Sequence, residues 1–78
     1  MEGIFGKRPA PNYRLIQVRK GRNLSRKEVA ARINVHWGTY CKWERGQQSP
    51  GLRHLRSLCD LFQTTPEELG YNLDDIGR

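Results

Sequence analysis

Apolar side chains recur three or four residues apart in several stretches of this chain, and short polar segments separate them. The first stretch follows Asn12, the second follows Ser25, the third extends from His36 to about Arg45, and the fourth begins near Leu52. Residues three or four apart share one face of a helix, so each stretch predicts an amphipathic helix. With 78 residues, the chain has the length of one small domain.

Capping signals predict where these helices begin and end. Ser25 precedes Glu28 by three residues, which is the capping-box arrangement of a helix start. Asn34 is expected to end the second helix, because Asn tolerates the left-handed conformation that a tight turn requires. Gly46 provides a similar stop for the third helix. The segment from Ser25 to Gly46 therefore predicts two short helices joined by a tight turn.

A fifth, shorter helix is predicted near the C-terminal end. From Thr65 to Glu68, a capping hydroxyl, a proline at the first helical position and a capping carboxylate follow one another. Five helices with short connections predict an all-α, compact five-helix bundle over residues 12–71. Residues 1–11 are expected to form a flexible basic arm, and residues 72–78 a C-terminal tail or linker.

The third helix is predicted to have an inner and an outer face. Tyr40 and Trp43 are three residues apart and are expected to pack inward, which argues against an aromatic platform for single-stranded nucleic acid. Its other residues are expected to lie mostly outward: Trp37, Gly38, Thr39, Cys41 and Lys42. In the fourth helix, one apolar stripe is expected to face the core: Leu52, Leu55, Leu58, Cys59 and Phe62.

Charge is distributed unevenly along the chain. The net charge is +6, and 13 of the 14 lysines and arginines lie between residues 7 and 58, where only Glu28 and Glu44 oppose them. Five of the acidic residues follow within residues 60–75. A basic surface around the predicted helices indicates an anionic partner such as a nucleic acid. An ordinary solvated basic face is the alternative interpretation.

The sequence lacks signals for catalysis and metal binding. It contains no phosphate loop, no paired carboxylates placed for acid–base chemistry and no nucleophile with a base, and His36 and His54 are isolated. Cys41 and Cys59 have the spacing of neither a disulfide framework nor a zinc site. We therefore expect a protein that is not an enzyme and that uses no cofactor and no metal. No apolar run approaches membrane-spanning length, so no membrane partner is expected.

Five segments, taken in order, resemble the lambda-repressor/Cro-like helix-turn-helix family, which is also called XRE-like. The segments are LSxxEVA from Leu24, INV from Ile33, WERG from Trp43, PxLxxL from Pro50 and TPEEL from Thr65. The resemblance extends over residues 13–71. It implies the five-helix repressor fold, with the third helix in the major groove of double-stranded DNA.

The resemblance also implies roles for individual positions. Arg19 and Glu44 fall where the family has a partly buried ion pair between the first and third helices, and Arg26 falls at a phosphate contact. The implied base-reading positions are Trp37, Gly38, Thr39 and Lys42. Further implied phosphate contacts are His36, Arg45, Gln47, Gln48 and Arg53. The alternatives are a helix cap for His36 and an ordinary solvated loop for the others.

The implied reading face departs from the family pattern at two positions. Many members carry Gln, Ser, Arg or Asn where this chain has Trp37 and Gly38. Direct readout is therefore expected to rest on Lys42, which can donate to guanine, and on Thr39. Trp37 is expected either to pack on a thymine methyl or the sugar-phosphate backbone, or to fold onto the protein surface or a partner.

The sequence thus predicts sequence-specific binding to double-stranded DNA by a transcriptional regulator, cytoplasmic and nucleoid-associated. The alternative is a protein-interaction module, such as an antitoxin or adaptor, that uses the same fold with Trp37 as an interface anchor. A homodimer on a palindromic operator is expected. The chain is either a complete small regulator or the N-terminal domain of a longer one, whose C-terminal effector domain is absent from this sequence.

Overall fold

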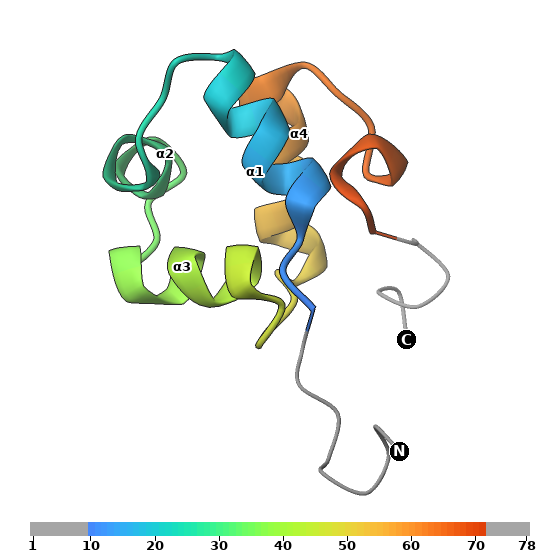
Figure 1. Ribbon diagram of the computed structural model, residues 1–78. Helices are drawn as coiled ribbons and strands as arrows, with labels where there is room; N and C mark the ends of the chain where they lie inside the picture. Colours follow the sequence, from blue (N-terminus) through green and yellow to red (C-terminus); the bar gives the residue numbers. More distant parts are fainter. Residues whose placement is uncertain (1–9, 72–78) are drawn as a thin grey trace, which may run out of the picture.

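The computed structural model describes residues 10–71, which form four α-helices and one 3-10 turn (Figure 1). In chain order these are α1 (Tyr13–Gly21), α2 (Arg26–Arg32), α3 (Trp37–Arg45), α4 (Leu52–Phe62) and η2 (Glu67–Leu69). No strand occurs within these residues, so the predicted all-α fold is confirmed. Except for Ala10 and Pro11, the predicted arm at 1–11 and the predicted tail at 72–78 lie outside the described residues.

The predicted fifth helix is instead a single 3-10 turn, η2. Its capping box is complete, because Glu68 N donates to Thr65 Oγ1 at 3.2 Å and Thr65 N donates to Glu68 Oε1 at 2.9 Å. Gly70 then adopts a left-handed conformation, with a φ of 85°, directly after Leu69. Glycine in this conformation ends a helix, so only one turn forms between the cap and the stop.

The other helix boundaries follow the start and stop signals in the sequence. Ser25 and Glu28 form a complete capping box at α2. At α1, Asn12 Oδ1 accepts a hydrogen bond from the backbone of the first turn at 3.1 Å, while its Nδ2 donates to the carbonyl of Leu69 at 2.9 Å. Asn12 therefore caps α1 and also ties it to η2.

Acidification is expected to weaken both capping boxes. Hydrogen bonds from Ser25 lower the pKa of Glu28, and hydrogen bonds from Thr64 and Thr65 lower the pKa of Glu68, each from an ordinary value of 4.5. A carboxylate with a lower pKa in the folded state stabilises that state above the unfolded-state pKa. This stabilisation is lost as the pH falls through the folded-state pKa.

The double variant Glu28→Gln, Glu68→Gln should therefore lose less stability than the parent protein as the pH is lowered below about 4.5. Urea unfolding between neutral pH and about pH 3 measures this difference. Glu67→Gln provides a matched control, since Glu67 lies beside Glu68 and its carboxylate makes no capping hydrogen bond within residues 10–71. An unchanged pH dependence in the double variant would contradict the prediction.

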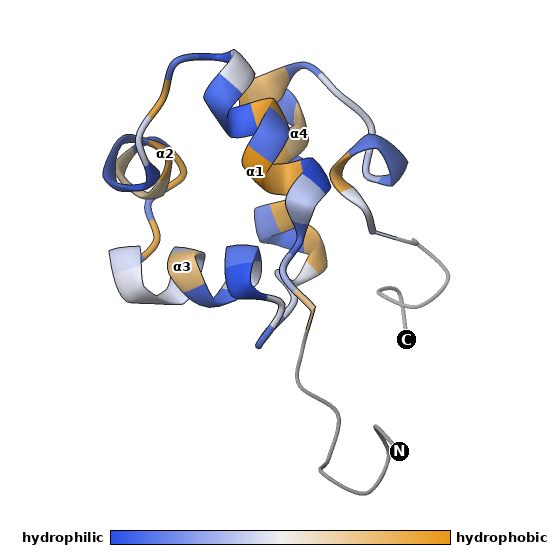
Figure 2. Ribbon diagram, viewed as in Figure 1, coloured by the Kyte–Doolittle hydropathy of each residue, from blue (hydrophilic) through white to orange (hydrophobic). Residues whose placement is uncertain are grey.

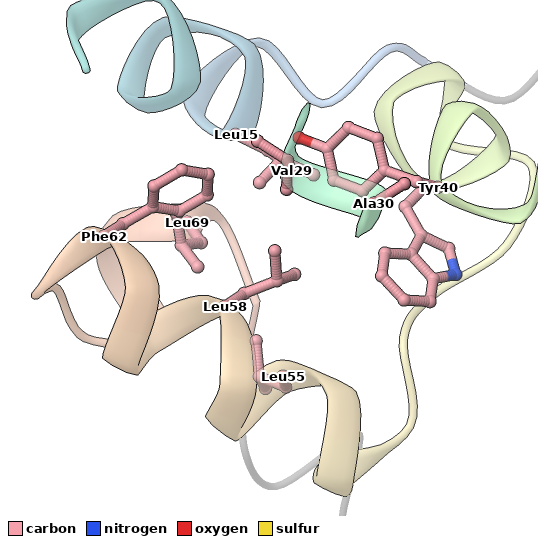
Figure 3. Close-up of a cluster of buried hydrophobic side chains, with 9 residues drawn as sticks. Leu15, Val29, Ala30, Tyr40, Leu55, Leu58, Phe62 and Leu69 are labelled. Atoms are coloured by element: carbon pink, nitrogen blue, oxygen red, sulfur yellow. The ribbon is translucent and has the colours of Figure 1, made fainter. Parts of the chain in front are cut away.

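Side chains from all four helices and η2 meet in one apolar core (Figure 3). Its buried members are Leu15, Val29, Ala30, Tyr40, Trp43, Leu55, Leu58, Phe62 and Leu69. In Figure 2, the connection between α1 and α2 is mostly hydrophilic, whereas α1 and α4 both carry apolar residues. The core holds both Tyr40 and Trp43, as expected from their spacing, so neither ring is available for stacking on nucleic acid.

Two expectations about burial are wrong. Cys41 was expected to lie outward but is only 4% exposed, because the buried face of α3 is broad and includes Tyr40, Cys41, Trp43 and Glu44. Leu52 was expected in the core but is 49% exposed, because it is the first residue of α4 and the core begins one turn later at Leu55. Burial excludes Cys41 from the chemistry of an accessible thiol.

Candidate nucleic-acid interface

The helices α2 and α3 are joined by a tight turn that fixes how α3 leaves α2. Asn34 takes the left-handed conformation, with a φ of 61°, and Val35 N donates to the carbonyl of Ala30 at 2.9 Å. Ile33 and Val35 pack against the core on either side of Asn34. In Figure 1, α3 runs along the lower edge of the molecule, with α2 above its first turn. The turn therefore holds α3 at the surface with one face in the core.

A buried carboxylate joins the three helices of this region. Glu44, on α3, is 2% exposed. Arg19, on α1, donates from Nε to Glu44 Oε2 at 2.6 Å and from Nη2 to Oε1 at 3.4 Å. Arg26, on α2, donates from Nε to Oε1 at 3.0 Å, and Tyr40 donates its hydroxyl to Oε2 at 2.6 Å. We refer to Arg19, Arg26, Tyr40 and Glu44 as the Glu44 cluster.

Two donors of the Glu44 cluster, Tyr40 and Arg19, have raised pKa values. Burial, together with the hydrogen bond to Glu44, raises the pKa of Tyr40, so its hydroxyl remains a donor. Burial by itself lowers the pKa of Arg19, but the hydrogen bond and charge of Glu44 outweigh it and raise that pKa overall. Arg19 also donates from Nη1 to the carbonyl of Leu24 at 2.8 Å, so the cluster extends to the connection between α1 and α2.

The guanidinium of Arg26 contacts Glu44 on one side and solvent on the other. Its side chain is 47% exposed, although its Nε is engaged by Glu44. Guanidinium carries five N–H donors, so the donors beyond Nε stay available at the surface between α2 and α3. The sequence did not indicate the contact between Arg26 and Glu44, because it joins different helices.

The other residues assigned to phosphate contact are exposed at the two ends of α3 and beyond it. They are His36 before the helix, Arg45 at its end, Gln47 and Gln48 in the loop, and Arg53 in the first turn of α4. The backbone N–H groups of Gln47 and Gln48 both donate to the carbonyl of Lys42, at 2.9 and 3.3 Å. Of the N–H donors of these two glutamines, only the side-chain amides are therefore available to a phosphate.

His36 and Gly38 form a local pair at the start of α3. His36 Nδ1 accepts a hydrogen bond from Gly38 N at 3.0 Å and thereby caps the helix. A Cβ added at Gly38 would lie 3.2 Å from His36 Nδ1 and 3.3 Å from Cε1. The missing side chain at Gly38 thus makes room for the capping imidazole, which is a structural reason for glycine at an implied base-reading position.

Trp37, the first residue of α3, is held by a lysine of α2. The Nζ atom of Lys27 lies 5.5 Å from the centroid of the Trp37 ring, a cation–π arrangement worth about 0.5–1 kcal/mol at an exposed site. Trp37 remains 46% exposed. The sequence did not identify Lys27 as a functional residue. The only signal for such a role was its position on the outer side of α2, two residues after Ser25.

The remaining implied reading residues differ in their exposure. Lys42 lies one turn after Gly38 on α3 and is exposed, whereas Thr39 is partly buried.

Within residues 10–71, no three His, Cys, Asp or Glu side chains gather as a metal site requires. None of the helices in that range is long and apolar enough to cross a membrane. The exposed groups on α3 and at its ends are cationic and amide side chains, the imidazole of His36 and the indole of Trp37.

Known proteins share this arrangement of helices. The model of a family described as "Helix-turn-helix" matches residues 15–69. The HTH-type transcriptional regulator AnsR of Bacillus subtilis is 39% identical over 56 residues, which are 72% of this chain and 48% of AnsR. The HTH-type transcriptional activator BcrR of Enterococcus faecalis is 33% identical over 58 residues, which are 74% of this chain and 28% of BcrR. This chain thus spans less than half the length of either relative.

A solved structure agrees with these sequence relationships. The crystal structure of the restriction-modification controller protein C.AhdI from Aeromonas hydrophila matches with a TM-score of 0.68 at 26% identity, covering 74% of this chain and 88% of C.AhdI. The family match extends over most of the chain and includes the turn, α3 and the Glu44 cluster. This chain therefore belongs to the helix-turn-helix family, in the lambda-repressor/XRE-like form that its sequence predicts.

Proposed function

We propose that this chain binds double-stranded DNA in a sequence-specific manner, as the DNA-binding part of a transcriptional regulator, with α3 in the major groove. The observation that carries the proposal is the outer side of α3, which is exposed and basic while its inner side is fixed by the core and the Glu44 cluster. A reading helix must be rigid to align several donors with base edges at once. Its family membership supports the same role.

In this proposal the exposed residues divide into two groups. Lys42, Thr39 and Trp37 face the bases. Phosphates are contacted by Arg26 and by the residues around the ends of α3: His36, Arg45, Gln47, Gln48 and Arg53. Phosphate contacts position a protein on the duplex, and base contacts specify the sequence. Gly38 has no side chain and belongs to neither group. Its role in this proposal is to leave room for the imidazole of His36, which caps α3.

Replacing Lys42 by alanine is expected to relax the preference at one base pair, by about 1–3 kcal/mol, because a lysine donor to guanine is lost. Arg53→Ala is the matched control, since Arg53 is exposed and its guanidinium makes no hydrogen bond within residues 10–71. It should weaken selected and random duplexes alike and reduce the salt dependence by about 0.9 in slope. Titration of duplexes selected from a random library measures both effects.

An equal loss on selected and random duplexes for Lys42→Ala would remove Lys42 from the base-reading group. Arg26 is a poorer control than Arg53, because its substitution would also disturb the Glu44 cluster. Failure to bind any duplex at low salt would favour the protein-interaction module, with exposed Trp37 as its anchor.

The assembly and the rest of the regulator belong to the same proposal. A homodimer would place two copies of α3 in successive major grooves, about 34 Å apart, on a palindromic operator. Two chains per selected duplex, counted by analytical ultracentrifugation, would support it, and one chain would contradict it. BcrR and AnsR are longer than this chain, which supports a C-terminal effector domain in the regulator, whereas C.AhdI is of similar length and supports a small regulator without one. The proposed role is DNA binding without catalysis, at the nucleoid in the cytoplasm.

A further inference from the structure

The exposed indole of Trp37 is unusual for a position that should carry a hydrogen-bonding side chain. It is 46% exposed, at the first residue of the exposed helix α3. Its neighbour on α2, Lys27, places its ammonium 5.5 Å from the ring centroid. The pair therefore bridges the two helices on either side of the turn, outside both the core and the Glu44 cluster.

Lys27 restricts where the indole can lie. An exposed side chain loses rotamer freedom when it enters an interface, and this loss weakens binding. An ammonium over one face of the ring favours a single placement before any ligand arrives. Since nearly half of Trp37 remains accessible, this placement leaves apolar surface at the start of α3 open to a partner.

The surroundings of the indole define the kind of partner. Lys27, Arg26 and Lys42 are all exposed, the first two on α2 in contact with α3 and the third on α3 itself, so the surface attracts a polyanion and repels a polycation. Within a DNA major groove, the 5-methyl group of thymine is the apolar group among the hydrogen-bonding edges of the bases. Gly38 follows Trp37 and brings no side chain that competes for this contact.

We propose that Lys27 and Trp37 act as one unit that reads the 5-methyl group of a thymine, Trp37 by direct contact and Lys27 by holding the indole in place. The proposal rests on the DNA-binding function proposed above and names the base feature that this part of the surface recognises. Trp37 is then a specificity-determining residue, and Lys27 is a positioning residue that also adds positive charge.

The experiment removes single methyl groups from the DNA. A duplex is selected from a random library with the parent protein, and each thymine is then replaced in turn by deoxyuridine, which lacks only the 5-methyl group. At one position, the parent protein should bind the deoxyuridine duplex roughly fourfold more weakly, the effect expected when one buried methyl is lost. The readout is the dissociation constant of the deoxyuridine duplex divided by that of the thymine duplex, because general losses of affinity or stability cancel in this ratio.

Variants then assign the effect to the two residues. Trp37→Ala should bring the ratio at that position to about one. Lys27→Met, which keeps an apolar stem, should lower the ratio, and Lys27→Arg should retain it because guanidinium also forms cation–π contacts. Lys20→Met removes the same charge from α1 and should leave the ratio unchanged while weakening binding in general.

Each outcome decides between the two proposals. Specific binding in which no thymine methyl matters, or in which Trp37→Ala keeps the full ratio, overturns this inference and leaves sequence-specific DNA binding intact. An unchanged ratio in Lys27→Met removes the positioning role of Lys27. If the library yields no enriched duplex, the proposed function fails, and the reading of thymine fails with it.

Discussion

Replacing Glu44 by alanine is expected to lower the free energy of unfolding by about 3–5 kcal/mol, the usual loss when one partner of a buried ion pair is removed. Arg19 is 7% exposed and would keep its charge in the interior without the carboxylate that it contacts at 2.6 Å. The hydroxyl of Tyr40 would lose its acceptor as well. Small domains have only about 5–15 kcal/mol of stability in total, so urea unfolding at low temperature is the appropriate measurement.

Two further variants separate the buried charge from simple loss of packing. Arg26→Met removes the half-exposed partner of Glu44 and should cost no more than about 1 kcal/mol, as exposed ion pairs generally do. The double variant Arg19→Met, Glu44→Leu removes both buried charges and should recover much of the stability that Glu44→Ala loses. If the double variant is as unstable as Glu44→Ala, the unpaired charge of Arg19 is not the cause.

Gly46→Ala is expected to give the second large effect. Gly46 has a φ of 77°, a left-handed conformation that costs about 1–2 kcal/mol for a residue with a Cβ. That Cβ would lie 1.9 Å from the carbonyl oxygen of Ala10, so the segment before α1 would have to move. This movement would weaken the nearby hydrogen bond from Asn12 N to the carbonyl of Glu44, which is 2.8 Å long in the structure. We expect a loss above about 2 kcal/mol in the free energy of unfolding.

Gly21→Ala is the matched control for Gly46→Ala. Gly21 is the last residue of α1, has no positive φ, and a Cβ there would meet nothing within 4 Å. Alanine is favoured over glycine in a helix by roughly 0.5–1 kcal/mol, so this variant should be neutral or more stable in thermal and urea unfolding. Equal effects at the two glycines would show that neither the backbone conformation nor Ala10 matters at Gly46.

Most of the fold was predictable because its signals are local. The capping box at Ser25, the left-handed turn at Asn34 and the stop at Gly46 each depend on a few neighbouring residues, and the structure contains all three. The fifth helix was overestimated, because Gly70 stops it after a single turn despite a complete cap at Thr65. The length of a helix therefore cannot be assigned from its start signal alone, because the next stop signal also determines it.

Errors in burial arose where the tertiary environment differs from an ideal stripe. Cys41 was expected to lie outward because only Tyr40 and Trp43 were assigned to the inner face. However, α3 contacts both α1 and α2, and its buried face is broader than one row. Leu52 fits the apolar period of α4 but lies at the end of that helix, where the core does not reach. Helical periodicity gives the direction of a side chain but not the width or the length of the surface that covers it.

The sequence by itself determined the number of long helices, most of their boundaries and the basic character of the chain. Through family resemblance it also predicts which positions of α3 face DNA. Only the tertiary structure decided which charged, polar and aromatic side chains contact one another. It shows Arg26 and Tyr40 joining Arg19 on one carboxylate, His36 filling the space above Gly38, and Lys27 lying over Trp37. The contacts of Arg26 with Glu44 and of Lys27 with Trp37 join different helices. Hydrophobic periodicity carries no information on the distance between side chains of two elements.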